Sequence, residues 1–304
     1  MRGVLVDANE EFEAVVHRLR QPGDAVDIHL DPDVAPERLP EVLGDAAIAL
    51  IDHTYLPTAI ARRCRNLRHV VFLGTGARSY MNPEELGEIG IQVHTISGYG
   101  DTAVAECAMA LMWEAARGIA RMDRAVRAGG WPRTEGVQLT GKTIGLIGFG
   151  GIAREVARMA AGIGMTVLAW NRTPRSAEGV RFVDLPVLLA ESHVVSMHLL
   201  LNDETRGFLS RERIAAMRPG AILVNTARGA LVDDDALIAA LDEGHLRHAG
   251  LDVFAVEPLP SDHPFTRMEN VTLAAHSAFR TPEASDNLIA AALAHCRRIA
   301  REGR

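Results

Sequence analysis

A glycine-rich turn between a strand-like run and a helix-like run constrains the fold of this chain more than any other feature. The turn is Gly148-Phe149-Gly150-Gly151-Ile152-Ala153, and it follows the apolar run Ile144-Gly145-Leu146-Ile147. In this context the first glycine permits a tight turn, the second lets the backbone approach a phosphate, and the small third residue lets the helix pack closely on a sheet. The order predicts a βαβ unit of a doubly wound sheet, with a helix N-terminus that faces the pyrophosphate of a dinucleotide.

Short apolar runs continue on both sides of this turn. Runs that do not alternate with polar residues are typical of strands buried on both faces of a parallel sheet. After the long central segment the predicted strands are Thr143 to Gly148, Thr166 to Trp170, His193 to Leu199, Ala221 to Asn225 and Ala249 to Val253, with a helix over Gly151 to Ala161. Before it they are Gly3 to Val6, Ala25 to Leu30, Ala46 to Ile51, Leu67 to Leu73 and Ile91 to His94, with a helix over Glu10 to Leu19. The sequence thus predicts two parallel β/α domains of unequal size.

The segment between the two sets of strands is predicted to be one long helix, Thr102 to Ala128. Asp101 is placed to cap its start, and Gly129-Gly130 to end it. The tail from Pro282 to Ile299 is also predicted to be helical.

Charge and hydropathy exclude two classes of partner. The net charge is -7, and no basic run is longer than Arg62-Arg63, which argues against nucleic-acid binding. The longest apolar stretch, Ala103 to Ala116, is interrupted by two glutamates and is too short to cross a bilayer. A strand-like run directly follows Met1, with no leader-like segment, so we expect a cytoplasmic protein without a membrane partner.

Cysteine and lysine usage limits the chemistry further. Cys64, Cys107 and Cys296 lie far apart without metal-ligand spacing, which favours buried thiols over a metal site. Lys142 is the only lysine among the 32 basic residues, so a single arginine is weak evidence of function in this chain.

Three later tracts carry a family resemblance. They are Asn225-Thr226-Ala227-Arg228-Gly229, the run from Gly250 to Glu257-Pro258, and His276-Ser277-Ala278 followed by Thr281-Pro282-Glu283-Ala284. Together with the glycine turn they resemble the D-isomer-specific 2-hydroxyacid dehydrogenase family. Alone, each residue could be a loop, a turn or a core histidine; at the ends of successive predicted strands the functional interpretation is favoured, because open parallel sheets bind ligands at that edge.

The resemblance implies a catalytic set. Reduction of a 2-oxoacid needs a hydride, a proton for the carbonyl oxygen and a cation for the carboxylate. By resemblance Arg228 holds the carboxylate and polarises the carbonyl, and His276 donates the proton. Glu257 would bind the other imidazole nitrogen, orienting the ring and favouring its charged form.

The same resemblance implies the architecture. We expect two doubly wound α/β domains with a cleft between them: a flavodoxin-like substrate domain of residues 1–98 and 282–304, and a Rossmann NAD(P)-binding domain of residues 99–281. The family also implies a homodimer. In the first domain Gly74, Thr75 and Gly76 resemble the loop whose N–H groups meet the substrate carboxylate.

The end of the second Rossmann strand bears on cofactor choice. An acidic residue about 20 positions after the glycines would bind the ribose 2′-hydroxyl of NAD, but Asn171 stands there and Arg172 follows. A neutral side chain with an adjacent guanidinium favours NADP over NAD, although Arg172 and Arg175 could simply be surface arginines. The expected cofactor-binding residues are Gly148, Gly150, Gly151, Ile152, Asn171, Arg172, Thr173, Thr205, Thr226, Ala227, Arg228, Asp252 and His276.

The sequence leaves several functions open. The first is a reductase of a small 2-oxoacid such as glyoxylate or hydroxypyruvate. The alternative within the family is D-3-phosphoglycerate dehydrogenase, for which Arg78 could supply the extra cation. An alternative of another class is a dinucleotide-sensing corepressor, although the chain has no long polar tail or docking extension.

Overall fold

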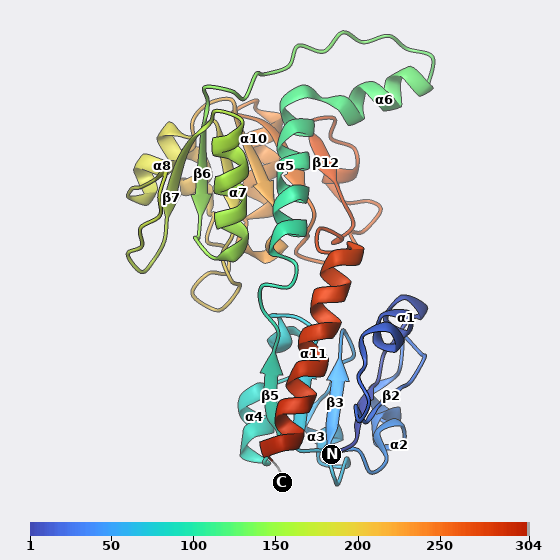
Figure 1. The fold of residues 1–304 in the computed structure, drawn as a ribbon. Coiled ribbons are helices and arrows are strands. Elements are labelled where there is room, and N and C mark those ends of the chain that lie inside the picture. Colours follow the sequence, from blue (N-terminus) through green and yellow to red (C-terminus); the bar gives the residue numbers. More distant parts are fainter. Residues whose placement is uncertain (303–304) are drawn as a thin grey trace. The chain divides into compact units, whose positions relative to one another are not determined.

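The chain folds into two compact α/β units (Figure 1). A computed structural model describes residues 1–302. The first unit consists of Met1–Gly100 together with the segment from Arg280 onward, and the second of Asp101–Phe279. Each unit contains one parallel sheet, of five strands in the first and seven in the second. The expected fold class, two doubly wound parallel-sheet domains, is confirmed.

The first unit is built on the sheet β2-β1-β3-β4-β5. Its strands are β1 (Gly3–Leu5), β2 (Val26–Ile28), β3 (Ile48–Ile51), β4 (His69–Phe72) and β5 (Gln92–Thr95). Its helices are α1 (Glu10–Leu19), α2 (Leu39–Leu43), α3 (Thr58–Ala61), α4 (Pro83–Glu88) and α11 (Pro282–Glu302). Apolar side chains of α1 and α11 pack on one face of this sheet, and those of α2, α3 and α4 on the other.

The second unit is built on the sheet β12-β11-β10-β9-β6-β7-β8, and all of its paired strands are parallel. The strands are β6 (Thr143–Ile147), β7 (Thr166–Trp170), β8 (Val180–Phe182), β9 (Val194–Met197), β10 (Ala221–Asn225), β11 (Leu246–Leu251) and β12 (Val271–Leu273). The helices are α5 (Asp101–Arg117), α6 (Ile119–Arg127), α7 (Gly151–Gly162), α8 (Leu185–Glu191), α9 (Arg211–Ala215) and α10 (Asp234–Asp242). The strand order reverses between β6 and β9, which is where such sheets bind ligands.

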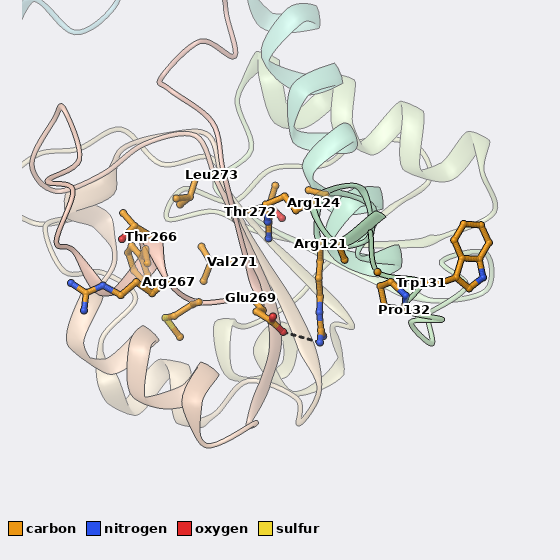
Figure 2. A pocket seen from close by; sticks show the side chains of 15 residues that line it. Arg121, Arg124, Trp131, Pro132, Thr266, Arg267, Glu269, Val271, Thr272 and Leu273 are labelled. Atoms are coloured by element: carbon orange, nitrogen blue, oxygen red, sulfur yellow. Dashed lines mark ion pairs between the residues drawn. The ribbon is translucent and has the colours of Figure 1, made fainter. Parts of the chain in front are cut away.

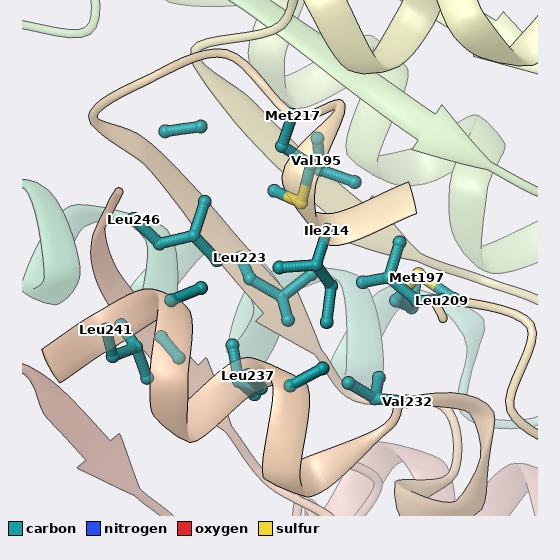
Figure 3. Packing of buried hydrophobic residues seen from close by; sticks show 14 of the residues in the cluster. Val195, Met197, Leu209, Ile214, Met217, Leu223, Val232, Leu237, Leu241 and Leu246 are labelled. Atoms are coloured by element: carbon teal, nitrogen blue, oxygen red, sulfur yellow. The ribbon is translucent and has the colours of Figure 1, made fainter. Parts of the chain in front are cut away.

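Alternate residues of the central strands supply the two cores of this unit. One face packs on α5 and α7 through residues such as Leu146 and Val224. The other packs on α8, α9 and α10, and Figure 3 shows Val195 and Leu223 of the strands with Leu237 of α10. Burying one such leucine stabilises the fold by about 2 kcal/mol, so the strands that carry the site are held from both faces.

The prediction of one continuous helix from Thr102 to Ala128 is wrong, because the structure has two helices that meet at Gly118. α5 ends at Arg117, Gly118 has a left-handed φ of 64°, and α6 begins at Ile119. The Glu114 carboxylate accepts a hydrogen bond from Ala120 N–H at 3.1 Å and so caps the new helix. The short edge strands β8 and β12 also lie outside the predicted set. Within residues 1–302 no helix has the length and apolar character needed to cross a membrane.

Candidate active site

The glycine turn after β6 has the geometry that its sequence predicts. Gly148 has φ of 91°, and a Cβ there would lie 2.6 Å from the carbonyl oxygen of His198, so only glycine fits. α7 begins at Gly151 with Gly150 as its N-cap, and no side chain caps this end. A Cβ on Gly150 would meet nothing within 4 Å. The space at Gly150 suits an anion such as a pyrophosphate, whereas at Gly151 the Asp101 carboxylate lies against the backbone, 1.7 Å from where a Cβ would stand.

Asn171 joins this turn to the loop after β7. Its Oδ1 accepts a hydrogen bond from Phe149 N–H at 3.1 Å, and its Nδ2 donates to the carbonyl of Thr173 at 2.7 Å. Arg172, between them, forms an ion pair with Glu204. The loop is therefore placed beside the glycine turn, as the expected cofactor role requires.

Thr205 closes the loop after β9. Its hydroxyl donates to the carbonyl of Leu200 at 2.6 Å and accepts from Asn202 N–H at 2.8 Å. The Asn202 Oδ1 accepts from Glu204 N–H and from Thr205 N–H, both at 3.0 Å. These hydrogen bonds hold the loop from Leu200 to Thr205 in one conformation.

Asn225 shapes the loop that carries Arg228, and the sequence analysis did not single it out. Its buried side chain accepts from Ala227 N–H at 3.0 Å and donates to the carbonyl of Arg228 at 3.0 Å. The next residue, Gly229, lies against the following loop, because a Cβ there would be 1.9 Å from the carbonyl carbon of Phe254. The signal for Asn225 was its position as the last residue of a buried strand, where an amide can bind both sides of a tight loop.

Glu257 and His276 form a hydrogen-bonded pair. Oε2 of Glu257 lies 2.6 Å from Nδ1 of His276, and Oε1 accepts from Phe254 N–H at 2.8 Å. Partial burial alone would raise the pKa of Glu257, but these two hydrogen bonds and the charge of Arg228 outweigh it, so the pKa lies below its usual value. Glu257 is therefore ionised at neutral pH and binds one ring nitrogen, leaving Nε2 of His276 for another partner.

Asp252 fixes the backbone around His276. Its two carboxylate oxygens accept from Ser277 N–H at 2.9 Å and Ala278 N–H at 3.0 Å, and its carbonyl accepts from His276 N–H at 2.7 Å. His276 has φ of 49°, the one positive φ at a residue other than glycine within residues 1–302. Such a conformation persists when surrounding contacts impose it, and it is frequent at functional sites. These contacts indicate a positioning role for Asp252, and its expected contact with a cofactor stays a prediction.

Four buried side-chain atoms lack a hydrogen-bond partner among the residues that the structure describes, Oγ of Ser192 and Ser196 among them, and the other two lie at this edge of the sheet. Those two are Nε2 of His198, directly after β9, and Oγ1 of Thr226, directly after β10. Burial lowers the pKa of His198 to about 4, so its ring is neutral at pH 7. Buried polar groups are normally satisfied, so these atoms fit a site that binds a polar group.

The sheet thus brings the predicted residues of the second unit to one edge. Gly148, Asn171 and Thr226 follow β6, β7 and β10, while Asp252 and His276 follow β11 and β12. In the first unit the predicted substrate loop of residues 74–76 follows β4, and the Arg78 side chain after it forms an ion pair with Glu84.

Replacement of Glu257 with glutamine should lower turnover at pH 7 by about a hundredfold, the lower end of what a positioned general acid contributes. The amide removes the negative charge beside Nδ1 of His276, so the ring loses the charged partner that orients it. The pKa of Glu257 in the folded state is lower than its ordinary value of 4.5. The pair with His276 therefore stabilises the fold above pH 4.5, and this stabilisation is lost as the pH falls through the folded-state pKa.

The measurement is kcat for oxoacid reduction between pH 5 and 9. The same substitution at Glu191, which pairs with Arg181 on the surface, is the control and should leave the profile unchanged. A Glu257→Gln profile that superimposes on that of the wild type would contradict the orienting role.

Comparisons with known proteins identify the family of the chain. Residues 109–278 match the NAD binding domain of the D-isomer specific 2-hydroxyacid dehydrogenases. The chain is 37% identical to a hydroxypyruvate reductase of Thermotoga maritima (84% of each protein covered) and 40% identical to a glyoxylate reductase of Thermococcus litoralis (67% of this chain and 66% of the relative). An acyclic imino acid reductase solved with NADPH and D-Arg superimposes with a TM-score of 0.86 at 26% identity, covering 99% of this chain and 98% of that one.

Proposed function

Because the chain belongs to the D-isomer-specific 2-hydroxyacid dehydrogenase family and is an oxidoreductase acting on CH–OH donors, we propose that it reduces a small 2-oxoacid of the glyoxylate or hydroxypyruvate type to the D-2-hydroxyacid. The observation that carries this proposal is the 2.6 Å pair of Glu257 and His276, which follows β11 and β12 at the edge where the glycine turn lies. Two relatives with this substrate range, at 37% and 40% identity, support it.

The residues of the second unit divide the work of reduction. A bound nicotinamide cofactor supplies the hydride. Arg228 binds the oxoacid carboxylate with its guanidinium and polarises the adjacent carbonyl. His276, oriented by Glu257, donates a proton from Nε2 to the carbonyl oxygen, and it recovers that proton from the hydroxyl group in the reverse direction.

The proposed cofactor site uses the turn and the loops around it. Gly148, Gly150, Gly151 and Ile152 cradle the pyrophosphate at the start of α7. The loops after β7, β9 and β10 supply further contacts through Asn171, Arg172, Thr173, Thr205, Thr226 and Ala227. In the first unit, Gly74, Thr75 and Gly76 bind the substrate carboxylate, so the segments 1–98 with 282–304 and 99–281 serve as substrate and cofactor domains.

NADPH is the preferred cofactor in this proposal. Asn171 carries no charge that would repel a 2′-phosphate, and its Nδ2 donates to the Thr173 carbonyl, a bond that an aspartate could not make. Arg172 stands next to it with a guanidinium suited to a phosphate. The structural relative solved with NADPH supports the preference.

D-3-phosphoglycerate dehydrogenase remains the alternative within the family. Its substrate carries a phosphate, for which Arg78 is the candidate cation in the first unit. The ion pair of Arg78 with Glu84 engages that guanidinium with a carboxylate, which favours an unphosphorylated oxoacid.

We also propose a homodimer that uses the surface around α6. This helix buries none of its side chains; Ile119 and Val126 are exposed on it, and Trp131 beyond it is 78% exposed. An adjacent groove of about 770 Å³ is lined by Trp131 and by Arg121 and Glu269, which form the ion pair drawn in Figure 2. Exposed apolar side chains of this size favour association, and a second copy would cover them.

The oxidation of NADPH and NADH, followed by absorbance, tests the substrate proposal. The panel is glyoxylate, hydroxypyruvate, pyruvate, phenylpyruvate and 3-phosphohydroxypyruvate. We expect the highest kcat/KM for glyoxylate or hydroxypyruvate, with NADPH preferred. Fastest turnover of 3-phosphohydroxypyruvate would transfer the assignment to the phosphoglycerate alternative, and absence of turnover across the panel would contradict the proposal.

A further inference from the structure

The ion pair of Arg172 and Glu204 lies at the end of β7, the strand whose end bears on the choice between NADP and NAD. The residues at the end of the second Rossmann strand meet the 2′ position of the adenosine ribose. In this chain that strand is β7, and Asn171 ties its end to the glycine turn through Phe149 N–H. Arg172 comes next, and its Nη1 donates to the Glu204 carboxylate, which belongs to the loop after β9.

The position of Glu204 is set by its own loop. Its N–H donates to the Asn202 side chain at 3.0 Å, and the Thr205 hydroxyl closes the loop on the Leu200 carbonyl at 2.6 Å. The side chains of Arg172 and Glu204 are 74% and 73% exposed, so a ligand has free access to both. The backbone therefore presents the carboxylate to Arg172, in an exposed contact that can shift cofactor affinity by only a few-fold.

The ion pair of Arg172 and Glu204 should affect the binding of NADPH more than the binding of NADH. A 2′-phosphate carries more than one negative charge, and it would bind the same guanidinium, whose Nη1 already donates to the Glu204 carboxylate. A cofactor with a 2′-hydroxyl places no such demand on Arg172. Resting on the proposed function, we infer that Glu204 is a cofactor-selecting residue, which competes with the 2′-phosphate for Arg172, weakens the preference for NADPH and leaves NADH usable by the same site.

Calorimetric titration of the full-length protein with NADP⁺ and with NAD⁺ tests this inference without relying on turnover. In Glu204→Gln the ratio of the NAD⁺ Kd to the NADP⁺ Kd should rise about three- to tenfold, since one repelling and competing charge is removed. Asp203→Asn is the matched control, because it removes the same charge from the adjacent exposed residue, and it should change the ratio by less than about twofold. Equal shifts in the two variants, or no shift in Glu204→Gln, would overturn the inference.

A double-mutant cycle separates competition from simple repulsion. In an Arg172→Ala background there is no fork to compete for, so adding Glu204→Gln should change the ratio by less than about twofold. A gain of about threefold or more without Arg172 would overturn the competition. If the wild-type protein binds neither dinucleotide, the proposed function fails; if it binds both and the ratio does not respond, only the role of Glu204 fails.

Discussion

Replacing His276 with alanine is expected to lower kcat for oxoacid reduction by about 10²- to 10⁴-fold, the range that a positioned general acid contributes. The variant loses one expected cofactor contact but keeps the glycine turn and the loop after β7, so the Kd of NADPH should change far less than kcat. Glu257 binds Nδ1 of His276 and the Asp252 carbonyl accepts from its backbone N–H, so the alanine variant removes the ring that these contacts position. Single-turnover kinetics and fluorescence titration of the cofactor measure the two quantities separately.

His17→Ala is the control for this variant. His17 is exposed on α1 and pairs with Glu13 at 3.7 Å, so its loss should leave kcat unchanged. Wild-type turnover in His276→Ala, with the protein folded by circular dichroism, would refute the assignment of His276 as the acid.

Replacing Arg228 with lysine is expected to lower kcat/KM for the oxoacid by about 10²-fold or more, because an ammonium cannot reproduce a bidentate fork on a carboxylate. Both parameters should change: KM rises because the carboxylate is held less well, and kcat falls because the carbonyl is polarised less. The measurement is steady-state kinetics with the oxoacid varied at saturating NADPH.

The matched control is Arg211→Lys, at an exposed position in α9. It makes the same chemical change away from the sheet edge and should leave both parameters unchanged. A variant at Arg228 that retains wild-type KM would show that another group binds the carboxylate.

The sequence predicted the parts of this fold that depend on local patterns. The glycine turn, the central strands and the tracts of Arg228 and His276 follow from residue types within a few positions of each other. The contacts at the break at Gly118 do not: the Glu114 carboxylate caps α6 and also accepts from Thr272 of β12, 158 residues away in the chain. A pattern within one helix carries no information about such a contact.

In the site too, local sequence patterns predicted some residues, whereas contacts between distant loops could not be predicted. The neutral Asn171 could be interpreted as a sign of cofactor choice, but its bonds to Phe149 and Thr173 depend on how two loops meet. Asn225 was missed because an asparagine at the end of a strand is an ordinary residue until the loop around it is known. The pairing of Arg172 with Glu204 joins residues from two different loops, so only the folded chain reveals it.

The close approach at Gly229 links parts of the site that have separate tasks. The loop bearing Arg228 and the backbone at Phe254, three residues before Glu257, touch with no space for even a methyl group between them. A residue change that displaces one loop must therefore displace the other. A larger side chain at Gly229 is expected to shift both Arg228 and Glu257, and so to impair both of their proposed roles at once.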